Sequence, residues 1–403
     1  MIQRFFCFVV LALITQLGVS QTKDSIFFSK ENINKPNLLS THSFGVFFMR
    51  LQGHFEMNAP KKTSFNISVE SGNVWSPPLK VYIPKNEADR EIIREYDWDF
   101  AHTAFDENTI EKDSFNISND GVIKGFKANL NFRLARKHEL QIGFRTYLLT
   151  KGKTPFTILT GDEFIENFHR DIAGGDDPFD RKVFGLNQAN INYTDRNGNN
   201  MNINAGDFFA TGIETSYYYY PDSFKSKNNT LAFNVGAHLG TNLSKHNQSI
   251  DFGLSTNGVK TFKINDKSLI NIGLNLGFLR KGLIDFNSSN LEFGTNNFIA
   301  NLENAVEYSF KTSKNFVHSF GANFYLQTSL NKKDEFEYII PIRHPDAFKS
   351  WGQGALNLYK NNNYWSFIYS FSRKTTTYFY LQQDLTLNNN PDLQTGIGYK
   401  FYL

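Results

Sequence analysis

The densest group of side chains that could do chemistry lies in FHRDIAGGDDPFDR, the stretch from Phe168 to Arg181. Carboxylates in a flexible loop supply the oxygen ligands that Ca²⁺ takes, and a histidine among them could transfer protons. The spacing matches no calcium-loop pattern, however, and acidic loops are commonly solvated surface. We expect no metal ion, no cofactor and no catalytic residue here, and keep a bound Ca²⁺ as the alternative. This loop cluster consists of His169, Asp171, Asp176, Asp177, Asp180 and Arg181.

Two other features have structural interpretations. The acidic stretch DRNGNN, from Asp195 to Asn200, contains an Asn-Gly pair and predicts a tight hairpin turn. His318 is the one histidine that we place on an apolar strand face, where a lipid hydrolase would need it beside a serine nucleophile. No partner serine can be identified, so we expect His318 at an interface. The sequence therefore predicts that the protein is not an enzyme, and a lipid hydrolase is kept as the least favoured functional hypothesis.

A further set of charged residues shares one property, because each stands on the polar side of a segment in which polar and apolar residues alternate. Such charges could pair with one another and fill an enclosed space, or they could line a pore and select solutes. Their spacing leaves both roles open. The residues are Arg50, Glu56, Lys127, Arg133, Glu139, Arg145 and Glu214.

The alternation itself predicts the elements that carry these charges. In HELQIGFRTYLL, from His138 to Leu149, every second residue is apolar, and period-2 alternation indicates an extended strand. The same pattern recurs along the chain, and its first instance has Phe47, Met49, Leu51, Phe55 and Met57 on the apolar side. Further instances lie at 65–69, 126–134, 231–239, 250–254 and 270–278, with weaker ones near 298–310, 316–328, 354–360, 363–373 and 377–387.

The polar faces of these predicted strands decide between two classes of protein. A soluble sandwich would carry many Lys and Glu on its outer face, whereas here Gly, Asn, Ser and Gln predominate, which suits a water-filled or hydrogen-bonded lumen. In lipid, open sheet edges leave backbone groups without partners, so the sheet must close. We predict an all-β, antiparallel transmembrane barrel of 12 to 14 strands, with a soluble secreted β-domain as the alternative. One inconsistency remains. Barrels usually have short turns on the periplasmic side, which means after even-numbered strands if the amino terminus is periplasmic. Here most short turns follow odd-numbered predicted strands.

Composition fits an exported envelope protein. Residues 1–20 carry Arg4, an apolar run and small residues before Gln21, which predicts a cleaved signal peptide and a single barrel domain over 21–403. The chain's one cysteine, Cys7, lies within that segment. The formal net charge of +3 is too balanced for a nucleic-acid partner, and the aromatic content of 16% is what a lipid-facing barrel requires.

Two long segments, 76–120 and 151–207, interrupt the alternation and are predicted to be irregular. Each contains a short helix-like stretch, EADREIIREY in the first and GDEFIENF in the second.

The last twelve residues, DLQTGIGYKFYL, place apolar side chains on one face up to the final position. This resembles the terminal strand signal by which outer-membrane barrels are recognised for assembly, carried here by Tyr399, Phe401 and Leu403. The resemblance implies a barrel assembly machinery as a partner.

Three motifs occur together in the order FHRDIAGGDDPFDR, AGDFFATGIETSYYYY and QQDLTLNNNPDLQTGIGYKF. From about Gly121 onward the chain resembles an uncharacterised family of bacterial outer-membrane proteins, a domain of unknown function. The matching positions include His169, Arg181, Asp207, Asp384 and Asp392. The resemblance implies location and fold, and it implies no chemistry.

Together these observations predict a barrel of the bacterial outer membrane with lipid around it. The first functional hypothesis is a passive pore or small-solute channel. The second is a closed structural or interaction barrel that binds a partner through its loops.

Overall fold

The computed structural model describes residues 30–38, 43–95, 107–153, 157, 159–173, 181–228, 230–287, 290–332, 337–341, 361–383 and 393–403. The predicted signal peptide at 1–20 lies outside the described residues. Asp176, Asp177, Asp180, Asp384 and Asp392 also lie outside them.

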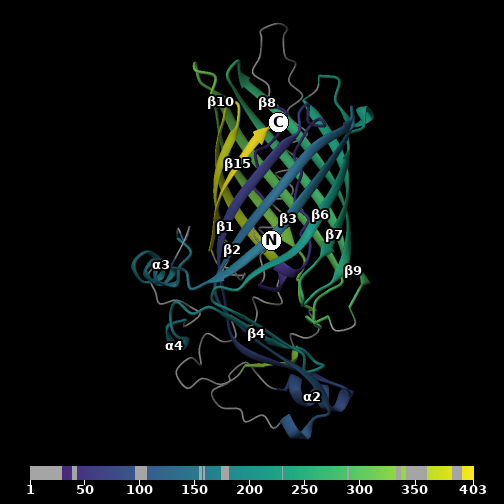
Figure 1. The fold of residues 1–403 in the computed structure, drawn as a ribbon, viewed down its shortest axis with the longest axis vertical. Helices are drawn as coiled ribbons and strands as arrows, with labels where there is room; N and C mark the ends of the chain where they lie inside the picture. Colours follow the sequence, from purple (N-terminus) through teal and green to yellow (C-terminus); the bar gives the residue numbers. More distant parts are fainter. Residues whose placement is uncertain are drawn as a thin grey trace.

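Within this part of the chain, 12 antiparallel strands form a closed barrel, which confirms the predicted fold class (Figure 1). Neighbours in the barrel follow the sequence order, and β1 closes the ring by pairing with both β2 and β15. The barrel strands are β1 (Ser64–Pro84), β2 (Lys112–Ala135), β3 (His138–Thr150), β6 (Phe208–Tyr219), β7 (Leu231–Asn242), β8 (Ser249–Asn265), β9 (Ser268–Asp285), β10 (Phe298–Lys311), β11 (Val317–Gln327), β13 (Asn362–Ser372), β14 (Thr376–Gln383) and β15 (Leu393–Tyr402).

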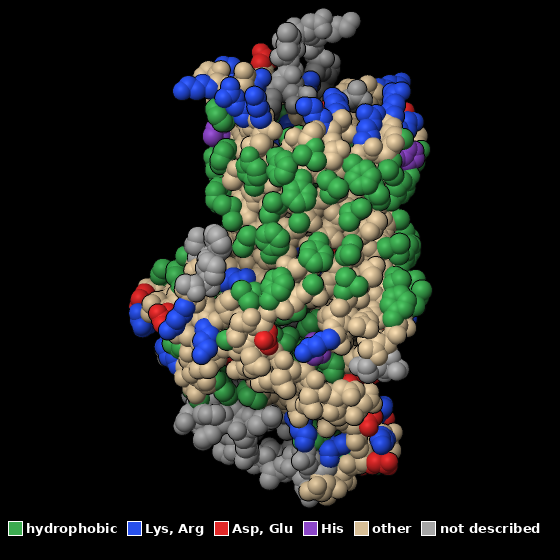
Figure 2. Space-filling model, viewed as in Figure 1, with side chains coloured by type: hydrophobic (Ala, Val, Ile, Leu, Met, Phe, Trp, Pro, Cys, Tyr) green, Lys and Arg blue, Asp and Glu red, His purple; other side chains and the backbone are tan. Residues whose placement is uncertain are grey.

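The side chains of each strand alternate between an apolar outside and a polar inside. Outward residues such as Phe144, Leu254 and Phe278 are exposed, whereas inward residues such as Asn257 and Glu303 are buried. Figure 2 shows apolar side chains as a belt across the visible face of the barrel, with Lys and Arg gathered at one end of it. Because backbone groups in a closed sheet are all paired, such a belt can face lipid without open edges.

The two ends of the barrel differ. One end has the turns 136–137, 266–267, 312–316 and 373–375, and we call it the short-turn end. The other carries the segments between β1 and β2, β3 and β6, β9 and β10, and β11 and β13, and we call it the long-loop end. The short helical elements are η1 (Ser43–Phe47), α2 (Glu87–Arg94), η2 (Glu107–Thr109), α3 (Asp162–Phe168), the π-helical η3 (His169–Ala173), α4 (Arg181–Phe184) and η4 (Asp222–Phe224). Among the described residues, no helix is both long and apolar enough to cross a membrane.

A small sheet extends from the long-loop end. The prediction that 76–120 is irregular is wrong at both ends of that segment, because β1 continues to Pro84 and β2 starts at Lys112. These extensions leave the barrel and form the small sheet with three additional strands, which are β4 (Asn190–Thr194), β5 (Asn200–Asn204) and β12 (Ile339–Pro341). There β1 pairs with β12 and β2 pairs with β4, and β5 pairs in turn with β4, as seen in the lower part of Figure 1. The β4–β5 turn spans 195–199, which confirms the hairpin predicted at DRNGNN.

The segment before β1 is not a barrel strand. The alternation at 47–57 predicts a strand whose apolar side faces lipid, and this prediction is wrong. Met49, Leu51 and Phe55 are buried inside the barrel, against glycines of the wall. Alternation reports two different surroundings for the two sides of a chain, but it does not identify either of them.

Candidate functional site: a polar cavity beside an internal hairpin

Residues 30–38 and 43–59 lie inside the barrel as two antiparallel arms and a tip that fill much of the lumen, and we call this segment the hairpin 30–59. One arm, 30–38, runs from the short-turn end, where Lys30 pairs with Glu307, toward the long-loop end. The tip at 43–48 contains η1, and the second arm, 49–59, returns to the short-turn end before β1 starts. The arms are joined by hydrogen bonds from Ile33 N to the Phe55 carbonyl (3.0 Å) and from Met57 N to the Glu31 carbonyl (2.8 Å). The outer ends of both described arms therefore lie at the short-turn mouth.

The wall formed by β7 to β10 is shaped to receive the second arm. A Cβ placed on Gly240 would lie 2.6 Å from Met49 Cβ, and one on Gly273 would lie 2.7 Å from Phe55 Cδ1. Real Cβ atoms do not approach other atoms so closely, so only glycine lets the arm lie this near the strand backbone. The missing side chains make a trough for the apolar side of the hairpin.

Asparagines next to this trough satisfy the backbone of the arm. Asn234, Asn257, Asn275 and Asn301 of four successive strands form an amide ladder with bonds of 2.8 Å. His54 N donates to Asn257 Oδ1 (2.9 Å), and Asn234 Nδ2 donates to the His54 carbonyl (3.1 Å). Buried backbone groups need such partners, and this wall supplies them without a regular strand pairing.

Two ion pairs and one histidine–carboxylate contact fix the hairpin at three levels along the barrel axis. Lys30 binds Glu307 and Lys35 binds Glu303, with all four side chains largely buried. Glu303 also accepts a hydrogen bond from Gly53 N (2.5 Å). Near the short-turn end, His54 Nε2 lies 2.9 Å from Glu139 Oε2. Removing one partner of such a buried pair would leave an uncompensated charge.

The opposite side of the lumen is not filled. A cavity of about 130 Å³ lies between the hairpin and the wall, starting near the short-turn end at Asn66, Asn131 and Lys400. A second cavity of about 20 Å³ continues it toward the long-loop end, and the two share lining residues. The shared residues are Asn37, Arg50, Gln52, Asn129 and Glu214. The arrangement is an interrupted polar passage alongside the hairpin.

Three cations surround the narrow second cavity. Arg145 Nε pairs with Glu214 Oε1 at 3.0 Å, and its guanidinium also donates to the carbonyl of Phe48 in the hairpin tip. Lys127 Nζ donates to the Leu38 carbonyl (2.5 Å). The Arg50 guanidinium lies over the ring of Tyr325, 4.2 Å from its centroid. Charges at such a constriction would act directly on a solute.

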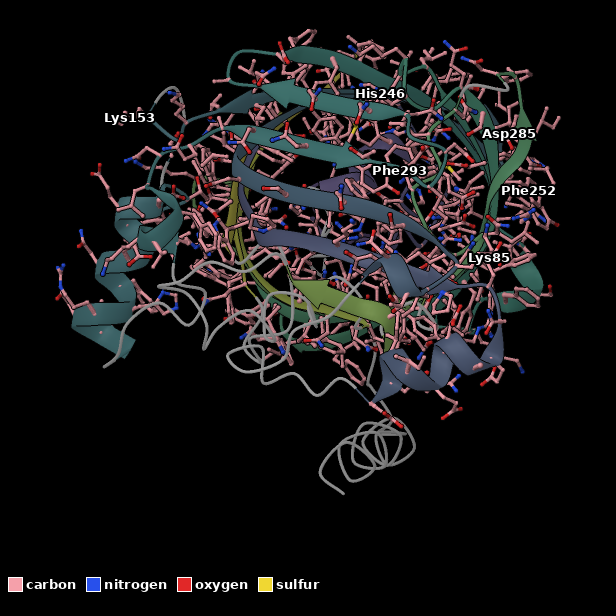
Figure 3. All side chains as sticks on the ribbon, turned by 90° about the horizontal axis from the view of Figure 1, so that it is seen from below. Lys85, Lys153, His246, Phe252, Asp285 and Phe293 are labelled. Atoms are coloured by element: carbon pink, nitrogen blue, oxygen red, sulfur yellow. The ribbon has the colours of Figure 1, made fainter. Side chains whose placement is uncertain are left out.

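The passage is closed at the long-loop end by aromatic contacts. Phe44 and Phe47 of the tip pack on Phe293 at centroid distances of 5.2 and 5.3 Å, and Tyr193 of β4 stacks on the same ring at 5.8 Å. Figure 3 looks onto this end and labels Phe293 together with His246, whose ring meets Phe47 at 5.9 Å.

Asp195 in the β4–β5 turn ties this closure together. It accepts a hydrogen bond from Glu292 N (3.1 Å), beside Phe293 in the β9–β10 segment. Burial alone would raise the pKa of Asp195, but the Asn199 side chain and three backbone N–H groups hold the pKa below its usual value. An ionised Asp195 thus joins two loops over the mouth.

The structure brings most of the predicted lumen candidates to one place. Arg50, Glu56, Lys127, Arg145 and Glu214 line the two cavities. Glu139 does not line either cavity. It contacts His54 and accepts a hydrogen bond from the Tyr220 hydroxyl (2.5 Å). Arg133 is apart, exposed at the short-turn end with its Nε bonded to the Ala135 carbonyl. Their role in solute selection stays a prediction.

The loop cluster does not converge in the described residues. Asp171 binds Arg170 of the same turn, which lowers the pKa of that carboxyl. His169 starts the π-helical turn, whereas Arg181 is buried elsewhere and donates to Asn73 Oδ1 of β1 at 2.6 Å. Within the ranges that the structure describes, no three His, Cys, Asp or Glu side chains group around a metal position. The Ca²⁺ alternative involves three aspartates outside those ranges and stays untested.

The remaining candidates lie on the outer surface. His318 Nδ1 is 2.9 Å from the Tyr369 hydroxyl, and its ring stacks on Phe310. Tyr399, Phe401 and Leu403 are at the end of β15, and Phe401 packs on Phe65 of β1. Recognition of these three residues by an assembly machinery stays a prediction.

The residues that sequence reasoning missed are those that hold the hairpin. They include Lys30, Lys35, Asp251, Glu303 and Glu307. A usable signal was present, because glycines occupy many polar-face positions of β7 to β9, and glycine within a strand often marks the close approach of another backbone.

Comparison with known proteins gives only distant similarities. No family model matches the sequence, and no curated protein matches it. An outer-membrane channel from Pseudomonas putida F1 is 7% identical, with 86% of this chain and 98% of that chain covered and a TM-score of 0.36. The NanC porin is 8% identical, with 71% and 96% covered and a TM-score of 0.36. The transport unit of the autotransporter AIDA-I from Escherichia coli is 8% identical, with 90% and 95% covered and a TM-score of 0.34. The resemblance to a family of unknown function stays a prediction.

Proposed function

We propose that the protein is a barrel of the bacterial outer membrane that passes a small solute through its lumen, and that the hairpin 30–59 closes this passage in the conformation described. The apolar belt and the closed sheet suit a lipid bilayer. Barrels usually carry their short turns on the periplasmic side, so the hairpin would enter and leave from the periplasm.

One observation favours a channel over a permanently filled barrel. The hairpin is packed tightly against β7 to β10 but leaves a polar cavity of about 130 Å³ on its other side. A barrel built only as an anchor gains nothing from such a space, because buried polar groups without neighbours cost free energy. A moving hairpin would widen this existing passage.

A second candidate function has its own support. The external sheet of β12, β1, β2, β4 and β5 adds structure beyond what a pore requires. It favours a closed barrel that presents its loops to a partner. In that case the hairpin would be a permanent part of the core.

A reversible lock separates the two functions. Met49→Cys with Gly240→Cys would place two sulfur-bearing Cβ atoms within disulfide reach after a small shift. In a planar bilayer we expect conductance steps from the reduced double variant and from a variant lacking 22–59, and silence from the oxidised double variant. The single variant Met49→Cys is the control for the substitution itself.

The opposite results are equally clear. If all these proteins migrate on gels as folded, heat-modifiable barrels and none conducts, the channel proposal is wrong and the closed interaction barrel stands. If the oxidised lock conducts as well as the reduced one, the hairpin is not the gate.

A further inference from the structure

We propose that the passage beside the hairpin selects anionic solutes, such as small carboxylates and phosphates, and that the hairpin itself creates this preference. The inference rests on the proposed function and names its solute class. It arises from how charge is divided between the wall of the barrel and the hairpin.

The charges facing the passage are mainly positive. Its two cavities are lined by five cations and two carboxylates, and the carboxylates are Glu56 and Glu214. Glu214 is paired with Arg145, and Glu56 with Lys400 at 3.7 Å. The lining cations are Lys35, Arg50, Lys127, Arg145 and Lys400.

The arrangement of these charges matters as much as their number. Arg50 lines both cavities and Lys127 lines the smaller second one, and Glu214 is the one carboxylate among the described residues that line this second cavity. Glu70 also lies in the field of Lys127, but it does not line either cavity and its side chain is bound by Ser68. An anion in the second cavity would meet two or three donors, whereas a cation would meet mostly like charge.

The wall alone has the opposite character. Among the buried inward-facing residues of the described barrel strands, acids outnumber cations, since Lys127, Arg145 and Lys281 stand against Glu70, Glu139, Asp251, Glu303 and Glu307. Lys30 and Lys35 of the hairpin neutralise Glu307 and Glu303, and Arg50 adds a further positive charge to the passage. In the conformation described, the hairpin covers the acidic side of the lumen, and the basic side still lines the passage.

Ion selectivity in planar bilayers tests this division. Phe48 lines the second cavity at its closed end and packs on Phe293 of the aromatic closure at a centroid distance of 5.5 Å, so Phe48→Ala should open the passage with the hairpin in place. Under a KCl gradient we expect its reversal potential to indicate chloride permeability about threefold above that of potassium, because fixed charge at a constriction sets selectivity. Arg50→Gln with Lys127→Gln in the same background should reduce the ratio to near unity. Lys314→Gln, in an exposed turn, is the matched control and should leave it unchanged.

The variant lacking 22–59 is the decisive comparison. Without the hairpin the acidic wall is uncovered, and the selectivity should reverse to favour potassium. If this variant conducts but Phe48→Ala is folded and silent, or if Phe48→Ala prefers potassium, the inference is overturned while the channel stands. If neither conducts although both are folded, the channel proposal fails first.

Discussion

The two sides of the lumen treat the same hairpin differently. On β7 to β10, glycines and an asparagine ladder bring the wall into direct contact with the hairpin backbone. On β1 to β3, β6, β14 and β15, the hairpin is reached only by long side chains such as Lys127, Glu139 and Arg145, and a cavity remains between the hairpin and the wall. The difference teaches that a single polar lumen can hold a plug on one side and keep a path on the other. The four predictions below test this contrast, from the largest expected effect to the smallest.

The largest effect is expected at Glu303, whose ion pair with Lys35 anchors the hairpin to the wall. Glu303→Gln leaves the buried Lys35 ammonium without its carboxylate. We expect the free energy that seats the hairpin to fall by about 3 to 5 kcal/mol, as for other broken buried pairs. Trypsin should then cleave folded protein at Lys35 or Arg50, which mass spectrometry can read. Lys35→Gln added to Glu303→Gln should restore part of the protection, and a single variant as resistant as the parent would contradict the anchor.

The glycine trough gives the next largest effect. Gly240→Ala puts a Cβ 2.6 Å from Met49 Cβ and should cost about 1 to 3 kcal/mol through overpacking. Gly321→Ala is the matched control, because its added Cβ meets no atom nearer than 3.5 Å. Urea unfolding in detergent micelles measures both. Equal urea midpoints for the two variants would mean that the arm does not pack closely against the wall at Gly240.

The open side should tolerate truncation. Gln141 lines the large cavity, so Gln141→Ala enlarges a space that is already unfilled. We expect a change in unfolding free energy within about 0.5 kcal/mol, as at sites outside packed cores. In the Phe48→Ala background the same change should raise single-channel conductance. A loss of stability like that of Gly240→Ala would remove the distinction between the sides.

The smallest effect concerns pH at the tip. Burial, with Lys245 nearby, lowers the pKa of His246 to about 4, and its ring packs on Phe47. An unpacked His246 takes up a proton near pH 6.5, whereas the packed one does so only near pH 4. Packing of the tip is therefore favoured fully above pH 6.5 and weakens as the pH falls toward 4. Conductance steps should become more frequent from pH 7 to pH 5, and His246→Gln should abolish the dependence.

The barrel could be predicted from sequence because its physics is local. Leu140, Ile142 and Phe144 alternate with Glu139 and Arg145, and a strand between lipid and a wet lumen requires that pattern. The helices at α2 and α3 follow from apolar spacing and flanking signals in the same way. The hairpin turn at 195–199 follows from the Asn-Gly pair.

The site could be predicted only in part. The alternation identified Lys127, Arg145 and Glu214 as inward-facing, but not their shared cavity, because pairing between strands distant in sequence determines which charges meet. The segment 47–57 shows the other limit, since it alternates as a strand does and yet lies inside. Without it, the first strand is β1, and the short turns follow the second, sixth, eighth and tenth strands of the barrel, which removes the inconsistency in the sequence-based topology.

The common mouth of the two hairpin arms bears on how the barrel can form. Leu403 N donates to the Thr63 carbonyl (2.9 Å), so β15 closes the ring on β1 beside the residues that join the hairpin to β1. A hairpin whose two arms have their outer ends at one mouth can be withdrawn and reinserted through that mouth. Folding of the wall and filling of its interior can therefore occur in either order, at a single seam.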